Sequence, residues 1–258
     1  MSGEVMAASA VVIGAIMFLT WMLSVALKNA SIVDIVWGLG FVAVAWTSFA
    51  VGDGDDTRRL VLALLATIWG LRLATHLAVR NIGHGEDYRY RAMRKHWGSR
   101  FPIISLFTVF LLQGILMWTV SLALQLGQVE SSPGFGPIGT MGVFVWVVGL
   151  AFEATGDQQL RKFKADPANQ GRVLNTGLWR LSRHPNYFGD AVVWWGIAIV
   201  AAEAGVGVFG LIGAAVMTFL LVRVSGVALL EKSLKKRKPE YQDYIRRTSA
   251  FFPRPPKN

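Results

Sequence analysis

Residues 5–27 read VMAASAVVIGAIMFLTWMLSVAL, and after the four residues KNAS the chain continues with IVDIVWGLGFVAVAWTSFAV at positions 32–51. About 20 predominantly apolar residues are enough for a helix to cross the hydrocarbon core of a bilayer. The two runs therefore predict two consecutive transmembrane helices. We expect the first run to be retained rather than cleaved, because no small-residue cleavage site precedes Lys28 and hydrophobicity resumes at once.

Further apolar runs extend this pattern along the whole chain, and the composition agrees with it. Of the 258 residues, 53% are hydrophobic and 16% are charged, whereas a soluble domain has about 25% charged residues. The sequence predicts an all-α, polytopic membrane bundle of about seven transmembrane helices in one domain, residues 1–258. The other five predicted spans are Leu60–Val79, Ile103–Leu126, Ile138–Phe152, Phe188–Ala202 and Val206–Leu230.

The basic residues are distributed unequally between the loops. Of the 26 Lys and Arg residues, 22 fall in segments on one side of the predicted spans, chiefly 80–100, 161–183 and the tail from Lys232. Basic loops stay in the cytoplasm, so the amino terminus is expected outside and the carboxyl terminus inside. The net charge of +10 is explained by this topology, and we expect no nucleic-acid partner. With no cysteine in the chain, disulfides and thiolate metal sites are excluded, and no metal site is predicted.

Several ionisable residues fall in the predicted spans or directly at their ends, and inside a span a charge costs at least about 2.5 kcal/mol on insertion scales. They are Asp34, Arg72, His76, Glu153, Asp190, Arg223 and Glu231. The predicted topology places all of them in the cytoplasmic half of the bundle, which indicates a polar cavity that opens inward. Arg72 and His76 are four residues apart on one helical face, one to two turns above Arg80, and favour an anionic ligand. The alternative is that these side chains snorkel or form structural ion pairs.

The segment between the fifth and sixth predicted spans carries the most specific pattern. It contains DPANQGR at 166–172, TGLWR at 176–180 and RHPNYFGD at 183–190. Pro185 suits the first turn of a helix, whose free N–H groups and positive dipole end favour an anion. Asp190, one turn further, could accept hydrogen bonds from an amide or a ribose hydroxyl. A lone His-Pro pair would indicate no more than a helix start.

A second loop, RNIGHGEDYRYR at 80–91, adds arginines, two carboxylates and two tyrosines. On its own it could be a solvated cytoplasmic loop. Together the two loops offer cations for phosphates, carboxylates for hydroxyls and aromatic faces for rings, which suits a dinucleotide. No Gly-x-Gly-x-x-Gly follows a predicted strand, so a Rossmann site is not expected.

At these residues the chain resembles the steroid 5-alpha-reductase family, most strongly over 157–253. The pattern at 183–190 is also similar to that of sterol C14 and C7 reductases. A looser form occurs in isoprenylcysteine and phospholipid methyltransferases, whose later glutamate and Tyr-x-x-Tyr could correspond to Glu231 and Tyr241–Tyr244.

The resemblance implies a seven-helix enzyme that binds NADPH from the cytoplasm and reduces the Δ4 double bond of 3-oxo steroids. It implies substrate-side helices and the first basic loop in 1–100, and an NADPH-binding region in 138–258. The cofactor contacts expected from the two loops and from the matched positions are Arg72, Arg80, Glu86, Asp87, Arg91, Asp157, Arg161, Lys164, Arg172, Trp179, His184, Asn186, Tyr187, Asp190, Glu231 and Tyr244. Two positions depart from the family, with Lys164 in place of an arginine and Asp190 in place of a glutamate.

For the reaction itself we expect Asp34 to be protonated and to donate a hydrogen bond to the substrate ketone, with Tyr88, His76 or water protonating the α-carbon. Asp34 could instead cap its helix. The third predicted helix lacks the tyrosine that steroid reductases use beside their glutamate. Trp37 and Trp69 could line the substrate pocket or pack helices together.

The expected partners are a lipid-soluble 3-oxo-Δ4 steroid or similar enone and the membrane lipids, with no obligate protein partner. The expected location is a bacterial inner membrane, with the active site open to the cytoplasm. Two alternatives are an S-adenosylmethionine-dependent methyltransferase and a non-catalytic sterol-binding membrane protein.

Overall fold

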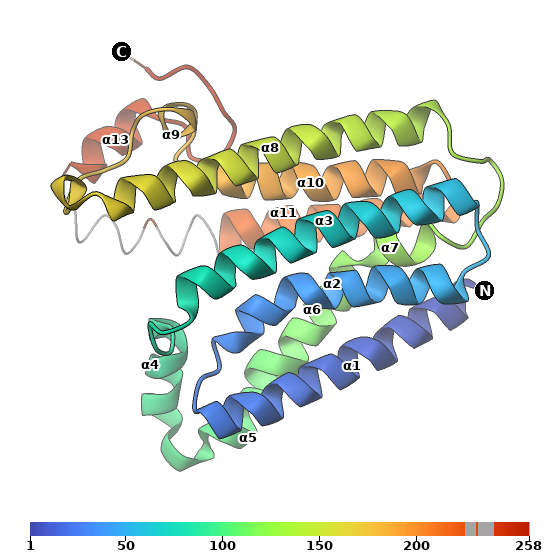
Figure 1. The fold of residues 1–258 in the computed structure, drawn as a ribbon, viewed down its shortest axis with the longest axis horizontal. Coiled ribbons are helices and arrows are strands. Elements are labelled where there is room, and N and C mark those ends of the chain that lie inside the picture. Colours follow the sequence, from blue (N-terminus) through green and yellow to red (C-terminus); the bar gives the residue numbers. More distant parts are fainter. Residues whose placement is uncertain (225–230, 232–239, 258) are drawn as a thin grey trace. The chain divides into compact units, whose positions relative to one another are not determined.

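The computed structural model describes residues 1–224, 231 and 240–257, and within these residues every regular element is a helix (Figure 1). Six helical stretches are long and apolar enough to cross a membrane. They are α1 (Ser2–Leu27), α2 (Ile32–Val51), α3 (Asp56–Asn81), the stretch Tyr88–Val120, α8 (Pro137–Ala165) and the stretch Val206–Val224. The predicted all-helical, multi-pass membrane architecture is confirmed at this level.

The structure differs from the seven predicted spans at two places, and a third predicted span is described only in part. The run 103–126 is divided into α5 (Phe101–Ser105), η2 (Leu106–Leu111), α6 (Leu112–Val120) and α7 (Leu122–Leu126), preceded by α4 (Tyr88–Trp97) and η1 (Gly98–Arg100). The run 188–202 forms α10 (Pro185–Ala202), which is not among the six candidate spans because Asn186 and Asp190 lower its mean hydropathy. The last run contains η4 (Val206–Phe209), α11 (Gly210–Phe219) and η5 (Leu220–Val224), and its predicted end, 225–230, lies outside the described residues. The count of seven and the inside–outside orientation stay predictions.

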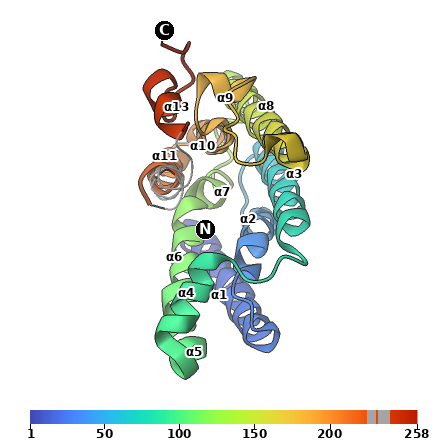
Figure 2. The same cartoon turned by 90° about the vertical axis from the view of Figure 1, so that its left-hand side faces the viewer.

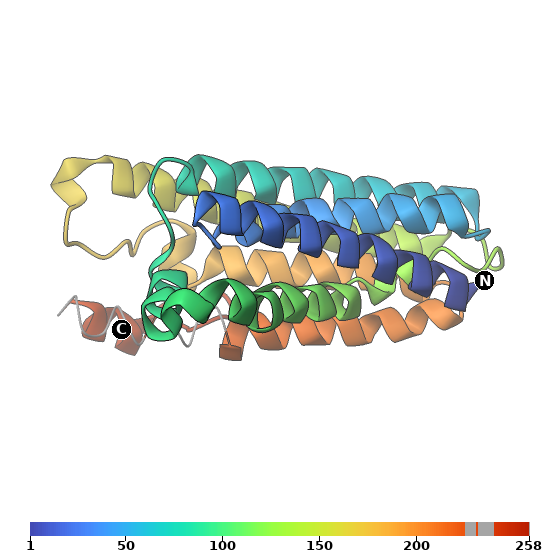
Figure 3. The same cartoon turned by 90° about the horizontal axis from the view of Figure 1, so that it is seen from below.

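The chain forms two compact units, residues 1–140 with 197–213 and residues 141–196 with 214–258. In the first unit α1, α2 and α3 run side by side, as Figures 1 and 3 both show. Glycines bring α2 and α3 together: a Cβ added at Gly38 would lie 2.4 Å from the carbonyl oxygen of Gly70. Such small residues let backbones approach closely where no hydrophobic effect drives helices together in lipid. Phe41 and Trp69 are completely buried between the helices.

The loops at one end of this unit are joined by Arg58, which has no exposed surface. Its guanidinium donates to the carbonyl oxygens of Gly127 at 2.9 Å and Pro133 at 2.6 Å, and also to that of Glu130. A buried arginine needs such acceptors because its charge cannot be removed at any physiological pH. Arg58 is therefore part of the packing, although its sequence position suggests only an exposed loop charge.

The second unit contains α8, η3 (Pro167–Asn169), α9 (Leu178–Leu181), α10 and α13 (Tyr241–Arg247). Figure 2 shows α9 and α13 near one another beside the ends of α8 and α10. Three glycines allow α8 and α10 to touch through their backbones. Added Cβ atoms would lie 2.5 Å from the nitrogen of Val193 at Gly149, 3.1 Å from the nitrogen of Asn186 at Gly156, and 2.3 Å from the nitrogen of Glu153 at Gly189.

Gly189 therefore fixes the distance between the helix carrying Asn186 and the helix carrying Glu153. We expect Gly189→Ala to destabilise the protein by about 1–3 kcal/mol, because the methyl group would have to push two backbones apart. Thermal unfolding of the purified protein measures this effect. Gly14→Ala is the control, because an added Cβ there has nothing within 4 Å. Equal melting temperatures for the two variants would contradict the close approach.

Candidate functional site

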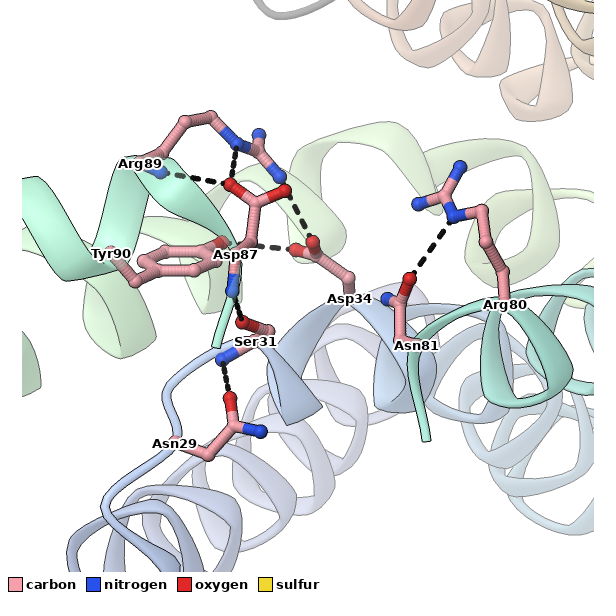
Figure 4. Close-up of polar contacts among 8 residues, drawn as sticks. All are labelled: Asn29, Ser31, Asp34, Arg80, Asn81, Asp87, Arg89 and Tyr90. Atoms are coloured by element: carbon pink, nitrogen blue, oxygen red, sulfur yellow. Dashed lines mark hydrogen bonds and ion pairs between the residues drawn. The ribbon is translucent and has the colours of Figure 1, made fainter. Parts of the chain in front are cut away.

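A polar cluster of Asp34, Arg89 and Tyr90 lies at the beginning of α2 (Figure 4). The Tyr90 hydroxyl donates to Asp34 Oδ1 at 2.9 Å, and Arg89 Nη2 donates to Asp34 Oδ2 at 3.0 Å. Tyr90 is buried and the other two side chains are partly buried. We call these three residues the Asp34 cluster. Each carboxylate oxygen of Asp34 thus accepts from a different donor on α4.

The cluster is held in place by the loop that precedes α4. Asp87 caps the helix, because its Oδ1 accepts from the backbone N–H of Arg89 at 2.9 Å and from Arg89 Nε at 2.9 Å. The Asp87 N–H in turn donates to the hydroxyl of Ser31 at 2.6 Å. Burial raises the pKa of Asp87, but the hydrogen bonds from Arg89 outweigh burial and leave the pKa below its usual value. The guanidinium of Arg89 is therefore positioned by two carboxylates.

Glu86 ties the same loop to the turn between α1 and α2. Its carboxylate accepts from the Ala30 N–H at 2.8 Å and forms a two-point ion pair with Arg94, at 2.8 and 2.9 Å. Burial raises the pKa of Glu86, and the hydrogen bonds from Arg94 and Ala30 lower it further than burial raises it. Planar two-point pairing of this kind is geometrically specific. Glu86 therefore acts on the Asp34 cluster through the loop.

Only some of the site residues predicted for the first unit belong to the Asp34 cluster. Asp34 contacts side chains of α4 and does not cap α2 with its side chain. Tyr88, the predicted proton donor, is 50% exposed, whereas Tyr90 two residues later reaches Asp34. Arg72 and His76 are half-buried on α3. These positions make Tyr90 the tyrosine that belongs to the cluster.

The two tryptophans predicted for the substrate pocket belong to one aromatic group with Phe41. The ring centroids of Trp37 and Phe41 are 5.2 Å apart and those of Phe41 and Trp69 are 5.7 Å apart, both edge to face. Trp69 is completely buried, so it packs helices, while Trp37 is partly accessible. Arg80 and Arg91 are exposed, and Arg80 donates to the neighbouring Asn81 at 3.0 Å (Figure 4).

In the second unit, Arg183 is the centre of a buried polar group with His184 and Glu231, which we call the Arg183 cluster. Arg183 Nε donates to Glu231 Oε1 at 2.7 Å, and His184 Nε2 lies 3.4 Å from the same oxygen. Arg183 also donates to the carbonyl oxygens of Ile245, at 3.2 Å, and Thr248. Arg183, the first residue of the pattern at 183–190, thereby holds the carboxyl-terminal segment in place.

Within the Arg183 cluster, the positive charge of Arg183 is paired with the negative charge of Glu231. Burial raises the pKa of Glu231, but the neighbouring His184 side chain and the hydrogen bond from Arg183 outweigh burial and lower the pKa to about 2. Tyr244 lies near this cluster, and its hydroxyl donates to the carbonyl oxygen of Trp179. Burial raises the pKa of Tyr244 well above its usual value. The Trp179 indole N–H donates to the Gly156 carbonyl at 3.1 Å, so α9 is held against α8 and α13.

The remaining predicted cofactor residues of this unit lie on α8, on α10 and in the loop between them. Asn186 Nδ2 donates to Asp157 Oδ1 at 3.0 Å, which joins an amide at the start of α10 to a carboxylate on α8. Tyr187 stacks on His184 with ring centroids 5.6 Å apart. Asp190 is buried. The basic side chains Arg161, Lys164 and Arg172 are exposed.

An amide and a carboxylate meet where α10 begins, and exposed cations follow on the end of α8 and in the loop after it. Residues Asp157 and Asn186 could hold the polar groups of the cofactor, and the three exposed cations could hold its phosphates. Among the described residues there is no group of His, Asp and Glu that could hold a metal ion.

Three residues of these clusters were not among the site residues predicted from the sequence: Arg89, Tyr90 and Arg183. A signal for Tyr90 does exist, because Asp87 is a good N-cap and Tyr90 and Arg94, four residues apart, share a face of the helix that follows. Arg183 is adjacent to the predicted His184, but only the fold brings Glu231 and the tail carbonyls to it.

Comparison with known proteins gives a family and one relative. The family described as "Protein of unknown function (DUF1295)", which is related to steroid 5-alpha-reductase-like proteins, matches residues 20–248. An uncharacterized protein of Schizosaccharomyces pombe is 26% identical over 260 residues, covering 91% of this chain and 75% of the yeast protein. No solved structure matches the chain.

Proposed function

We propose, from the premise that the chain belongs to the DUF1295 family, that it is an NADPH-dependent reductase of a carbon–carbon double bond conjugated to a ketone in a membrane-soluble lipid. The Δ4 bond of a 3-oxo steroid is the substrate type we favour. The observation that carries the proposal is the hydrogen bond from the Tyr90 hydroxyl to Asp34 in a chain with the reductase-like motif at 183–190.

The reaction needs a hydrogen-bond donor for the ketone. NADPH, when bound, supplies a hydride to the β-carbon of the enone, and negative charge then develops on the ketone oxygen. Tyr90 provides the donor, because its hydroxyl can turn from Asp34 to that oxygen. Asp34 and Arg89 position the phenol. The protonated Asp34 expected from the sequence stays a prediction, and Tyr90 is the donor that we propose here.

The α-carbon must receive a proton to complete the reduction. His76, half-buried on α3, or a water molecule is the proposed source. A hydride at the β-carbon and a proton at the α-carbon would together saturate the double bond, with NADP⁺ as the second product. In the second unit, Asn186, Asp157 and the basic residues of 161–172 are the proposed cofactor-binding groups.

The direct test incubates the purified protein with NADPH and Δ4-3-oxo steroids while the absorbance of the cofactor is followed. We expect steroid-dependent loss of that absorbance and a saturated ketone as the product. Cofactor binding without reduction of any enone lipid in a broad panel would contradict the proposed reaction.

An S-adenosylmethionine-dependent methyltransferase is the second candidate. One observation favours it: Glu231 contacts Arg183, and Tyr244 contacts Trp179, so the glutamate and the Tyr-x-x-Tyr of the methyltransferase pattern both meet the segment 179–184.

Ligand-dependent thermal stability separates the two candidates. We expect NADPH to raise the melting temperature, because a ligand at 100 times its Kd stabilises the folded state by about 2.7 kcal/mol. S-adenosylmethionine at the same concentration should have no effect. The reverse pattern would favour the methyltransferase, and stabilisation by sterol alone would indicate a sterol-binding protein without catalysis.

A further inference from the structure

The second unit contains an open pocket of about 530 Å³ between the segment that precedes α9 and the carboxyl-terminal segment. Its lining includes three cationic side chains, Arg180, Arg247 and Lys257, and two carboxylates, Glu240 and Asp243. A volume in this range is typical of sites for small molecules. The Asp34 cluster, Asn186 and Asp157 are not part of this pocket.

The charges of the lining select an anion that also carries hydroxyl groups. The three cations exceed the two carboxylates by one. Asp243 is paired with Arg246, which lies outside the lining. This pairing offsets the negative charge of Asp243 and makes the pocket more positive. Two guanidinium groups suit a phosphate, which they can bind through paired N–H groups. Carboxylates beside them would accept hydrogen bonds from the free hydroxyls of an alcohol that is esterified to the same phosphate.

The position of the pocket indicates a ligand from the membrane surface. The segment 166–184 follows α8, a candidate membrane span whose last turns carry Arg161, Lys162 and Lys164, so it lies on the side of the membrane at which that helix ends. The tail carries an aromatic pair: Phe251 is buried and packs edge to face on Phe188 at 5.8 Å, whereas Phe252 is 59% exposed. An exposed phenylalanine close in sequence to Lys and Arg occurs in segments that lie on a membrane surface.

We propose that this pocket binds the headgroup of an anionic phospholipid of the phosphatidylglycerol type. Arg180, Arg247 and Lys257 would contact the phosphate, and Glu240 would accept a hydrogen bond from the glycerol hydroxyls. The lining has more cations than carboxylates, and one of its carboxylates is already paired with Arg246, so its excess positive charge suits an anionic headgroup. The proposal does not depend on the reductase reaction, because none of the four residues that would contact the headgroup is assigned to that reaction; Tyr244, a cofactor contact expected from the sequence, also lines the pocket.

Native mass spectrometry of the full chain in a neutral detergent tests the proposal. Phosphatidylglycerol and phosphatidylcholine with identical acyl chains are added in separate titrations, and inorganic phosphate is the soluble probe of the same chemistry. We expect one phosphatidylglycerol to be retained in preference to phosphatidylcholine, with millimolar phosphate competing only weakly. Arg180→Gln and Arg247→Gln, tested separately, should each weaken phosphatidylglycerol binding about tenfold.

Arg254→Gln is the matched control. It removes the same charge from an exposed residue of the same tail that does not line the pocket, and it should change affinity less than about twofold. Unchanged melting temperatures show that the variants are folded. Equal retention of the two lipids would overturn the proposal, as would equal losses in Arg247→Gln and Arg254→Gln. Displacement of the lipid by low concentrations of phosphate would also overturn it and assign the pocket to a soluble phosphate.

Discussion

Tyr90→Phe is expected to lower the kcat of enone reduction about 100- to 1,000-fold, because it removes the one hydroxyl that Asp34 holds in the Asp34 cluster. Loss of a single donor to a developing oxyanion has an effect of this size in well-studied enzymes. The substitution removes one oxygen atom and keeps the ring that packs beside Arg89. Steady-state kinetics with a Δ4-3-oxo steroid and saturating NADPH measures the loss.

Tyr88→Phe is the control for this experiment. It makes the same chemical change two residues away, on a side chain that is half exposed. We expect its kcat to stay within about twofold of the wild type, because surface groups away from the site contribute little. The affinity for NADPH should be unchanged in both variants, which separates chemistry from cofactor binding. If Tyr88→Phe were the inactive variant, the choice of Tyr90 as the catalytic tyrosine would be wrong. The choice of Tyr88, made from the sequence, would then be correct.

The contrast between these two tyrosines illustrates what the sequence can and cannot predict. Apolar length and the placement of charges predict α1, α2 and α3 to within a few residues, because a bilayer imposes those lengths on any helix that crosses it. The register of a short polar helix has no such constraint. Which tyrosine of Tyr88-Arg89-Tyr90 faces Asp34 depends on where Asp87 caps α4 and on how Ser31 holds Asp87.

Long-range contacts are the second kind of information that the sequence does not contain in readable form. Glu231 could be recognised as an ionisable residue near the end of a span, and Arg183 as part of a motif. Their pairing joins residues 48 positions apart, and the tail carbonyls that share Arg183 are more than 60 positions from it. Asp157 and Asn186 were both expected at the cofactor, but their hydrogen bond depends on the glycine contacts between α8 and α10.

Arg183→Gln is expected to reduce the free energy of unfolding by about 3–5 kcal/mol, the cost of breaking a buried ion pair by removing one partner. Arg183 is 8% exposed, and its loss would leave Glu231 without its strongest donor and the Thr248 carbonyl without its guanidinium. Thermal unfolding followed by tryptophan fluorescence measures the effect, and limited proteolysis reports release of residues 240–257. Arg180→Gln, an exposed arginine three positions earlier, should unfold like the wild type.

The same ion pair determines how stability depends on pH. Because the pKa of Glu231 is lowered to about 2 in the folded protein, its contribution is complete above the unfolded pKa and is lost as the pH falls through the folded one. The wild type should therefore lose stability between about pH 5 and pH 2. Arg183→Gln has already lost most of this contribution at neutral pH, so its melting temperature should fall less over the same range. Parallel acid profiles for the two proteins would show that Glu231 does not depend on Arg183 for its charge.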